Sequence, residues 1–303
     1  MRERIRARGA AKLNLALSVG GPDAEGMHPI SGWMATIDLF DDLEIVRLPI
    51  GHPSRYAVLW HDEARRISDI DWSISKDLAA NAHRALEKAV GRALSIQAKI
   101  EKRIPVGGGL GGGSADAAAM LHGVNALFDL GLTTPELAEI SAPLGSDIPF
   151  LVHGGAAMVG GLGERIDSVP PPSDLHLVLI FPETACPTGP VYRRLDELRP
   201  HWDVAEAAVR QLATGQPEAA SLFNDLVEPA FDLHPDLLAD RDRIATIAES
   251  AVHLSGSGST FFVLARGSFE ADLLAGAISE RTGMPAIAAS TAPGVEIGEI
   301  DRG

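Results

Sequence analysis

The feature that most constrains this chain is a run of glycines that passes directly into a helix-forming segment. Six of the seven residues in 107–113 are glycine, and an alanine-rich stretch follows Ser114. Apolar residues alternate over 94–100, as in a half-buried strand, so the predicted local order is strand, glycine loop and helix. A helix N-terminus offers unpaired N–H groups and the positive end of a dipole, and glycines let an anion approach the backbone closely. The stretch 104–118 is therefore predicted to cradle a polyphosphate.

The glycine run has other interpretations. It is not a P-loop, because no Gly-Lys-Ser/Thr follows the glycines, and it lacks the spacing of a dinucleotide-binding fingerprint. Glycine runs are often flexible linkers. Linkers, however, rarely lie between a charged strand end such as Lys102-Arg103 and an abrupt apolar helix, so we favour the cradle.

Composition limits the class of protein. A chain of 303 residues is one large domain or two of ordinary size. The hydrophobic content of 46% and charged content of 22% are those of a globular protein. The net charge of −15 argues against nucleic acid as a partner, because binding phosphates along a duplex requires clustered Lys and Arg. An anionic ligand must therefore be held by a local site.

Cysteine content and hydropathy indicate the compartment. One cysteine, Cys186, excludes an internal disulfide framework and a Cys-rich metal site. The first eight residues are too charged for a signal peptide, and no stretch reaches the roughly 18 apolar residues of a membrane span. We expect a cytoplasmic protein with no membrane partner.

Periodicity and turn residues predict the elements of the first half. Strands are expected over 4–9, 15–19 and 94–100, with a strand or pair of strands over 33–46 that is broken at Asp41-Asp42. Residues 51–72 give weak signals and are interpreted as a surface excursion. Helices are expected over 75–90, about 115–127 and from 133 to near Pro143, with Ser75 and Thr134 as N-caps, Pro135 at the first position of the third helix, and Gly91 as a stop.

In the second half, composition shifts after the three prolines at 170–172. We place a domain boundary near residue 160, which divides the chain into 1–160 and 161–303. The expected elements are a strand at 154–166 ending in a glycine turn with Glu164, a buried strand at 175–181, a helix after 188–192, mostly helical segments over 204–250, a small-residue loop and strand over 253–265, a helix at 268–282 and a strand at 286–291.

Three polar residues interrupt apolar surroundings. Lys12 and Asn14 are two apart, so they face the same side of an extended segment, although an exposed edge strand would show the same pattern. Asp147 lies between Gly145-Ser146 and Ile-Pro-Phe, a setting that partly buries its carboxylate. A buried charge needs a partner, and Lys12 is the candidate if the first strand lies nearby; a helix cap or turn is the alternative. His28, alone on a loop, usually has no special role.

Several motifs in this order resemble the GHMP small-molecule kinase superfamily, which includes galactokinase and the homoserine and mevalonate kinases. The motifs are most similar to those of the kinases that phosphorylate the 2-hydroxyl of 4-diphosphocytidyl-2-C-methyl-D-erythritol in non-mevalonate isoprenoid synthesis. The resemblance covers nearly the whole chain and is weakest over 50–72 and 195–250. Its motifs are Lys12-Leu-Asn-Leu, Gly26-Met-His28, Lys102-Arg-Ile-Pro with the glycine loop, Leu144-Gly-Ser-Asp-Ile-Pro-Phe150, Gly161-Leu-Gly-Glu164, Pro187-Thr-Gly-Pro-Val-Tyr192 and Leu254-Ser-Gly-Ser-Gly-Ser.

The resemblance implies a two-domain α+β GHMP kinase fold with the active site between the domains. Residues 1–160 would form an ATP-binding domain of the ribosomal protein S5 domain 2-like type, and 161–303 a ferredoxin-like substrate domain. The glycine loop would hold the phosphates of ATP with Mg²⁺. The expected partner is a small molecule that carries a cytidine diphosphate, and the protein is expected to be a monomer or weak homodimer.

The resemblance also implies roles for single residues. Asp147 would be the catalytic base, with Lys12 beside it to stabilise charge, which agrees with the needs of phosphoryl transfer. ATP would contact Lys102, Pro105, Gly107, Gly108, Gly109, Leu110, Gly111, Gly112, Gly113 and Ser114, with Asp77 near the adenine and Ser114 at the metal. Substrate would contact Asn14, His28, Asp147, Thr188, Tyr192, Gly256 and Ser257, with His28 and Tyr192 holding the cytosine ring.

Two departures from the family pattern affect the substrate more than ATP. Met27 stands where the family usually has tyrosine, and Ala115 replaces a common second serine of the loop. Other GHMP kinases, acting on mevalonate, homoserine or a sugar, and an inactive binding protein on the same fold are the alternatives. A kinase for a substrate without a base has no need of the His28–Tyr192 clamp, and retention of Lys12 and Asp147 argues against an inactive protein.

Overall fold

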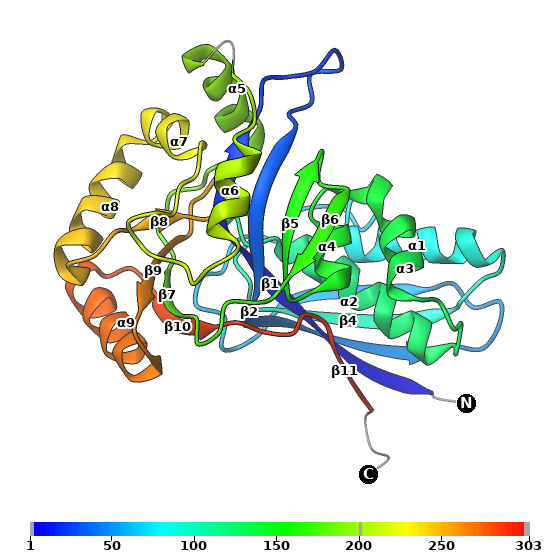
Figure 1. Cartoon of the computed structure of the whole chain (residues 1–303). Coiled ribbons are helices and arrows are strands. Elements are labelled where there is room, and N and C mark those ends of the chain that lie inside the picture. The colour runs from blue at the N-terminus through cyan, green and yellow to red at the C-terminus, as the bar shows by residue number, and fades with distance from the viewer. Residues whose placement is uncertain (1–2, 200–201, 300–303) are drawn as a thin grey trace.

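Two β-sheets organise the chain in this computed structural model, which describes residues 3–199 and 202–299 (Figure 1). The first sheet has the order β11-β1-β2-β4-β3, and β5 and β6 continue it beside the N-terminal half of β2. β3 is parallel to β4, whereas the other neighbours are antiparallel. The strands are β1 (Arg4–Val19), β2 (Ile30–Arg47), β3 (Arg55–Trp60), β4 (Ile96–Lys102), β5 (Ala156–Gly161), β6 (Arg165–Val169) and β11 (Glu296–Glu299).

The first two strands are longer than the sequence predicted. The expected strands at 4–9 and 15–19 are one strand, β1, and β2 is not broken at Asp41-Asp42. Their pairing shifts register between Ala10 and Ala11 and again between Asn14 and Ala16. Such shifts bend and twist a pair of strands without ending it. Asp41 and Asp42, where a break was predicted, pair in regular register with Gly9 and Arg8.

The prediction that 51–72 is only a surface excursion was wrong in part. Residues 55–60 form β3, the edge strand of the first sheet, and pair with 97–102 of β4. The side chains of β3 are exposed or half-buried, so the strand lacks the clear apolar alternation that marks a covered sheet. A weak sequence signal is what a partly covered edge strand produces.

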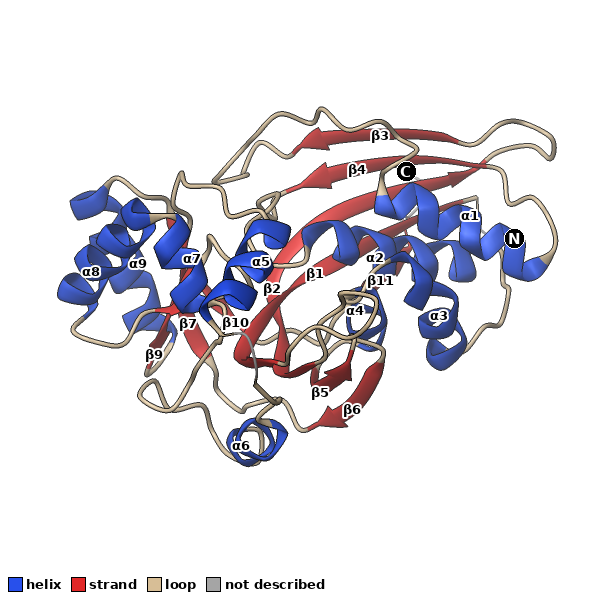
Figure 2. Cartoon of the chain, turned by 90° about the horizontal axis from the view of Figure 1, so that it is seen from above, coloured by secondary structure: helices blue, strands red, loops and turns tan. Residues whose placement is uncertain are grey.

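Helices α1 to α4 gather on one face of the first sheet, where α2 packs on β1 and β2 and is flanked by α1 and α4 (Figures 1 and 2). They are α1 (Leu78–Val90), α2 (Gly112–Leu127), α3 (Thr134–Ser141), the 3₁₀ turn Ala142–Leu144 and α4 (Ile148–His153).

Helix boundaries differ slightly from the sequence predictions. Asp77, not Ser75, caps α1, and Gly91 ends it as expected. Helix α2 begins at Gly112, within the glycine run. Thr133, not Thr134, caps α3 in a capping box with Glu136, which puts Pro135 at the second helical position. Short polar side chains in series offer more than one possible cap, so the sequence leaves the choice open.

The second sheet has the order β10-β7-β9-β8, and α9 packs against β7, β9 and β10. The helix expected at 268–282 is confirmed, whereas the segment 188–192 opens helix α5 and does not precede it. The elements are β7 (His176–Ile180), α5 (Thr188–Leu198), α6 (Glu206–Leu212), α7 (Val227–Leu233), α8 (Pro235–Ala248), β8 (His253–Leu254), β9 (Phe261–Ala265), α9 (Ser268–Thr282) and β10 (Ala286–Ser290).

The first strand and the last segment of the chain connect the two sheets. Leu17 and Val19, at the end of β1, pack in the core of the second sheet. After β10 the chain returns to the first sheet as β11, which the sequence analysis missed. The expected division near residue 160 lies within β5, and the change of sheet falls between Val169 and His176; the functional domains stay a prediction. Within the described ranges, no helix is both long and apolar enough to cross a membrane.

Candidate active site

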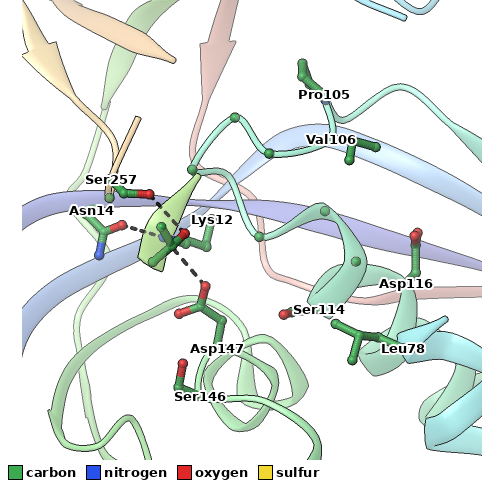
Figure 3. Close-up of a pocket in the computed structure, with 18 of the residues that line it drawn as sticks. Lys12, Asn14, Leu78, Pro105, Val106, Ser114, Asp116, Ser146, Asp147 and Ser257 are labelled. Atoms are coloured by element: carbon green, nitrogen blue, oxygen red, sulfur yellow. Dashed lines mark hydrogen bonds and ion pairs between the residues drawn. The ribbon is translucent and has the colours of Figure 1, made fainter. Parts of the chain in front are cut away.

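A cavity of about 510 Å³ opens between the two sheets, along the glycine loop. Its wall combines the middle of β1, the start of α2, the start of α4, the first turns of α5 and the loop before β9 (Figure 3). Nearly all of the sequence-predicted site residues line it. They are Lys12, Asn14, Asp77, Lys102, Pro105, Gly107, Gly108, Gly109, Gly111, Gly112, Gly113, Ser114, Asp147, Thr188, Tyr192, Gly256 and Ser257.

The lysine of the first strand and the aspartate of α4 meet in this cavity, as the sequence analysis expected. Lys12 Nζ lies 3.7 Å from Asp147 Oδ2 and donates a hydrogen bond of 2.5 Å to Asn14 Oδ1. The Lys12 side chain is 6% exposed, so it is held in place, whereas that of Asp147 is 29% exposed and open to the cavity. A fixed ammonium beside a reachable carboxylate is thus the polar centre of the site.

Asp147 occupies the N-cap position of α4, but it does not act as a cap. Its carboxylate accepts no capping hydrogen bond from the backbone of this helix, within the described residues. Pro149, at the second position, lacks an N–H to donate. The cap interpretation that the sequence left open is therefore wrong, and the carboxylate is available for chemistry.

The glycine loop passes so close to other backbone that side chains are excluded at key points. At Gly109, with φ of +76°, a Cβ would lie 2.0 Å from the Ser255 carbonyl oxygen. Gly111 precedes α2 with φ of +69°, and its Cβ would lie 3.0 Å from Lys12 Cγ. The first N–H groups of α2, from Gly112 onward, have no acceptor within the helix and lie at the cavity. These N–H groups lie where the sequence predicts an anion cradle, which stays a prediction.

Leu110 differs from its neighbours in the loop. It was predicted among the nucleotide contacts, but its side chain is fully buried in the core and is not among the residues that line the cavity. Its carbonyl accepts the N–H of Lys12 at 2.9 Å. Leu110 therefore fixes the loop to β1, because an apolar side chain between glycines is best accommodated in the core.

The small-residue loop before β9 supports the glycine loop through hydrogen bonds. The Ser255 hydroxyl donates to the Gly109 carbonyl at 2.9 Å, and the Thr260 N–H donates to the Gly108 carbonyl at 3.2 Å. Ser257, beside Gly256 at the cavity, shares a hydrogen bond of 3.1 Å with Thr188 at the start of α5. Residues from the second sheet thus set the conformation of the phosphate loop on the first.

The predicted cytosine clamp forms a contact of its own. The rings of His28 and Tyr192 pack edge to face with centroids 5.0 Å apart, and His28 Nε2 lies 2.8 Å from Asp196 Oδ1. Tyr192 lines the cavity, whereas His28 is not among its lining residues. Burial, with a smaller contribution from the charge of Asp147, raises the pKa of the Tyr192 phenol to about 12. The phenol therefore stays protonated and can donate a hydrogen bond.

Asp77 has a structural partner at both carboxylate oxygens. It accepts the Ala80 N–H at 2.9 Å as the cap of α1, and it accepts the indole N–H of Trp72 at 3.1 Å. It also borders the cavity. The structure thus gives Asp77 a folding role that does not depend on any ligand.

Several lining residues were missed by the sequence analysis, above all Trp72 and Lys76. Both precede α1, next to the segment that gave weak signals. Lys76 was placed inside a helix, one residue after the expected N-cap Ser75, which concealed that it lies on a turn at the cavity. Asp116 and Ser146, also lining residues, lie inside recognised motifs and could have been included from their spacing.

Comparison with known proteins first defines a class. Residues 77–155 match the family described as the GHMP kinases N terminal domain. A solved homoserine kinase from Cytophaga hutchinsonii shares the fold with a TM-score of 0.72 over 98% of each chain, at 17% sequence identity. The family match and the shared fold place the chain among the GHMP kinases.

Nearer relatives narrow the class. Proteins named 4-diphosphocytidyl-2-C-methyl-D-erythritol kinase from Bacillus cereus and Bacillus cytotoxicus are 36% and 38% identical over 84% of this chain and 86% of their own. A crystal structure of 4-(cytidine 5'-diphospho)-2C-methyl-D-erythritol kinase matches with a TM-score of 0.72 and 32% identity, covering 94% of this chain and 98% of that chain. The chain belongs to the family of 4-diphosphocytidyl-2-C-methyl-D-erythritol kinases. The resemblance and the α+β fold class predicted from the sequence are confirmed.

Proposed function

We propose that this protein transfers the γ-phosphoryl group of ATP to the 2-hydroxyl of 4-diphosphocytidyl-2-C-methyl-D-erythritol, a step in non-mevalonate isoprenoid precursor synthesis. The observation that carries the proposal is the Lys12–Asp147 pair, 3.7 Å apart at the mouth of the glycine loop. The names of its relatives support the choice of substrate.

The mechanism follows from the charges of the pair. Asp147 accepts the proton of the substrate hydroxyl as that oxygen attacks the γ-phosphorus. The adjacent Lys12 ammonium stabilises the negative charge that develops on the attacking oxygen. Asn14 keeps Lys12 in position through the hydrogen bond to its ammonium. Phosphoryl transfer depends mainly on positioning and charge stabilisation, and these residues supply both.

The cradle fits a nucleotide polyphosphate. The glycines at 107–109 and 111–113 leave room for phosphate oxygens, and the N–H groups at the start of α2 are directed to that space. Pro105 and Asp77 border the same end of the cavity and are proposed to contact the rest of the nucleotide, next to Trp72 and Lys76.

Mg²⁺ fits the site as an ion held largely by the nucleotide. The described residues contain no group of three or more His, Cys, Asp or Glu side chains suited to a metal. The Ser114 hydroxyl lines the cavity in the first turn of α2 and would supply the protein ligand. When bound, Mg²⁺ neutralises phosphate charge and orients the γ-phosphoryl group.

Substrate would bind on the side of the cavity formed by the second sheet. Thr188, Gly256 and Ser257 are proposed to place the diphosphate, and Tyr192, supported by His28, to hold the cytosine ring. Met27, where the family has an aromatic residue, is 51% exposed and can still cover a base with its thioether side chain.

The test is a coupled assay of ADP release with three acceptors, namely the cytidine-linked diphosphate, mevalonate and homoserine. We expect turnover with the first alone. Turnover with mevalonate or homoserine instead would assign the protein to another GHMP activity. Absence of ADP release with every acceptor, by a protein that binds ATP, would favour an inactive binding protein.

The cytosine clamp has its own test. Replacing both His28 and Tyr192 by Ala should raise KM for the cytidine substrate about 10-fold or more, because aromatic contacts to a base are lost. KM for ATP should change far less, since the glycine loop, which is proposed to hold ATP, is unaltered in this variant. Equal increases in KM for the two substrates would reject the cytosine clamp.

A further inference from the structure

A buried cluster of three charged residues joins the two ends of the glycine loop. We call this cluster (Asp41, Lys102 and Asp116) the clamp, and it is separate from the cytosine clamp. Lys102, the last residue of β4, donates hydrogen bonds of 2.5 Å to Asp41 Oδ2 and to Asp116 Oδ2. Asp41 belongs to β2, and Asp116 to the second turn of α2. The side chains of Asp41, Lys102 and Asp116 are 0%, 2% and 6% exposed. Strand, loop and helix are thus tied at one point.

The other carboxylate oxygen of Asp41 holds the backbone that enters the loop. Asp41 Oδ1 accepts the N–H groups of Arg103 at 2.5 Å and Ile104 at 2.8 Å. Pro105, the next residue, begins the cavity wall. Asp41 therefore fixes the entry of the loop, and the Lys102–Asp116 hydrogen bond connects this entry to the helix that leaves the loop.

The charge of Lys102 is already matched inside the protein. Burial opposes ionisation of the ammonium, but Asp116 and Asp41 outweigh burial and raise the pKa of Lys102. Asp116 Oδ1 is buried and has no hydrogen-bond partner among the described residues. A phosphate drawn to Lys102 would meet two carboxylates as well. Lys102 is therefore not a free cation that could bind a polyphosphate.

A buried charged cluster is also poor evidence for stability alone. Desolvation of such groups often equals or exceeds their mutual attraction, and apolar residues of similar volume are frequently as stable. What the cluster does provide is a fixed distance and direction between three elements, because each hydrogen bond is short and shielded from water.

We propose that Asp41, Lys102 and Asp116 are positioning residues, which set the glycine loop in its nucleotide-binding conformation. Lys102 and Asp116 border the cavity, but the Lys102 ammonium is bonded to the two carboxylates and not to the nucleotide. The inference rests on the proposed function in one respect, that the loop binds a nucleotide. It replaces a direct Lys102–nucleotide contact, expected from the family resemblance, by an indirect role, and it assigns functions to Asp41 and Asp116.

The two roles of Lys102 predict opposite results for Asp116→Asn. If Lys102 contacted phosphate directly, loss of a competing carboxylate would leave ADP binding unchanged or make it tighter. If the clamp positions the loop, Asp116→Asn should raise Kd for ADP, measured by calorimetric titration without acceptor, about 10-fold or more. An unchanged or lower Kd would overturn the clamp.

A second readout does not depend on nucleotide. Hydrogen exchange of the backbone amides at 107–113 should be faster in Asp116→Asn than in wild type, measured well below the Tm of both. A residue that only stabilised the fold would lower Tm and leave both Kd and local exchange unchanged under those conditions. Unchanged exchange in this loop would count against the clamp even if Kd changed.

Glu101→Gln is the matched control. Glu101 lies on the same strand and forms a partly exposed ion pair with Lys99 at 3.0 Å, so its loss should alter neither readout. If Asp116→Asn does not fold, Asp41→Asn serves in its place, because the amide oxygen can still accept the two N–H groups. Wild type that fails to bind ADP would overturn the proposed function, whereas wild-type binding with unchanged variants would overturn the clamp alone.

Discussion

At the residue scale, the side chain of Asp147 illustrates how position and role can differ. It occupies an N-cap position, yet its carboxylate faces Lys12 across the cavity and does not bond to its own helix. A sequence shows that an aspartate precedes Ile-Pro-Phe, which is compatible with either use. Only the approach of β1, 135 positions earlier, distinguishes them.

The first prediction concerns this carboxylate. Asp147→Asn removes the base but keeps the volume and polarity of the side chain, so kcat should fall by about 10² to 10⁴-fold, the usual contribution of a general base. Kd for ADP should stay nearly unchanged, because the carboxylate lies on the acceptor side of the cavity. Steady-state kinetics with a binding titration measure both. An Asn variant with near-normal kcat would show that the base is elsewhere.

The second prediction uses two glycines of the loop. Both Gly107 and Gly109 have positive φ, but a Cβ on Gly107 would meet no atom within 4 Å, whereas one on Gly109 would lie 2.0 Å from the Ser255 carbonyl oxygen. Gly107→Ala should cost about 1–2 kcal/mol of unfolding free energy from the left-handed backbone alone. Gly109→Ala should cost about 1–3 kcal/mol more, because the two loops must separate.

Denaturant unfolding of the Gly107 and Gly109 variants measures this difference. Equal losses of stability would mean that the loop before β9 does not exclude a side chain at position 109. The comparison needs no ligand, so it reports on the brace between the loops whatever the substrate is.

At the element scale, most helices and strands follow from local sequence. Helix α9 has the bounds that its pattern predicts, and the strand–loop–helix order around the glycines is also confirmed. The failures share a cause. β3, β11 and the full length of β1 are defined by their pairing with other strands. Pairing is a property of two segments, so one segment cannot reveal it.

The third prediction separates the folding role of Asp77 from a role in binding. Asp77→Ala removes the cap of α1 and should lower the free energy of unfolding by about 1 kcal/mol. Asp77→Asn keeps a side-chain oxygen for the Ala80 N–H and should retain most of that stability. If Asp77 also contacts the nucleotide, both variants should weaken ADP binding. Loss of stability in Asp77→Ala with normal binding in Asp77→Asn would assign Asp77 to the cap alone.

At the scale of the whole molecule, the active site depends on the contact between the two sheets. β1 supplies Lys12 and Asn14 to the cavity and buries Leu17 in the core of the second sheet. Asn224 Nδ2 donates to the Gly256 carbonyl at 2.7 Å, which fixes the loop that braces the glycines. Residues from both halves of the chain therefore hold the glycine loop in place.

The fourth prediction concerns the stability of the folded chain at acid pH. Burial lowers the pKa of His253, on β8, to about 4, whereas the imidazole of an unfolded chain titrates near 6.5. The unfolded state takes up this proton first as pH falls. The stability that the neutral ring contributes is therefore complete above pH 6.5 and is lost progressively as pH falls toward 4, by about 3 kcal/mol at most.

His253→Phe should remove that part of the pH dependence. The ring packs against Phe262 with centroids 5.1 Å apart, so an aromatic replacement keeps the contact. Denaturant unfolding at pH 7 and pH 4.5 should show a smaller loss of stability in the variant than in wild type. An identical loss would place the source of acid sensitivity in other groups.

The sequence by itself determined the order of strand, glycine loop and helix, the small-molecule kinase class and most of the residues around the cavity, because these depend on local backbone preferences and on motifs of a few residues. The tertiary structure alone decided that Lys12 meets Asp147, that Lys102 is held between Asp41 and Asp116, that Trp72 and Lys76 border the cavity, and that the last strand returns to the first sheet. Each of these is a contact between segments far apart in the chain, and such contacts are set by strand register and packing, which no single stretch of sequence specifies.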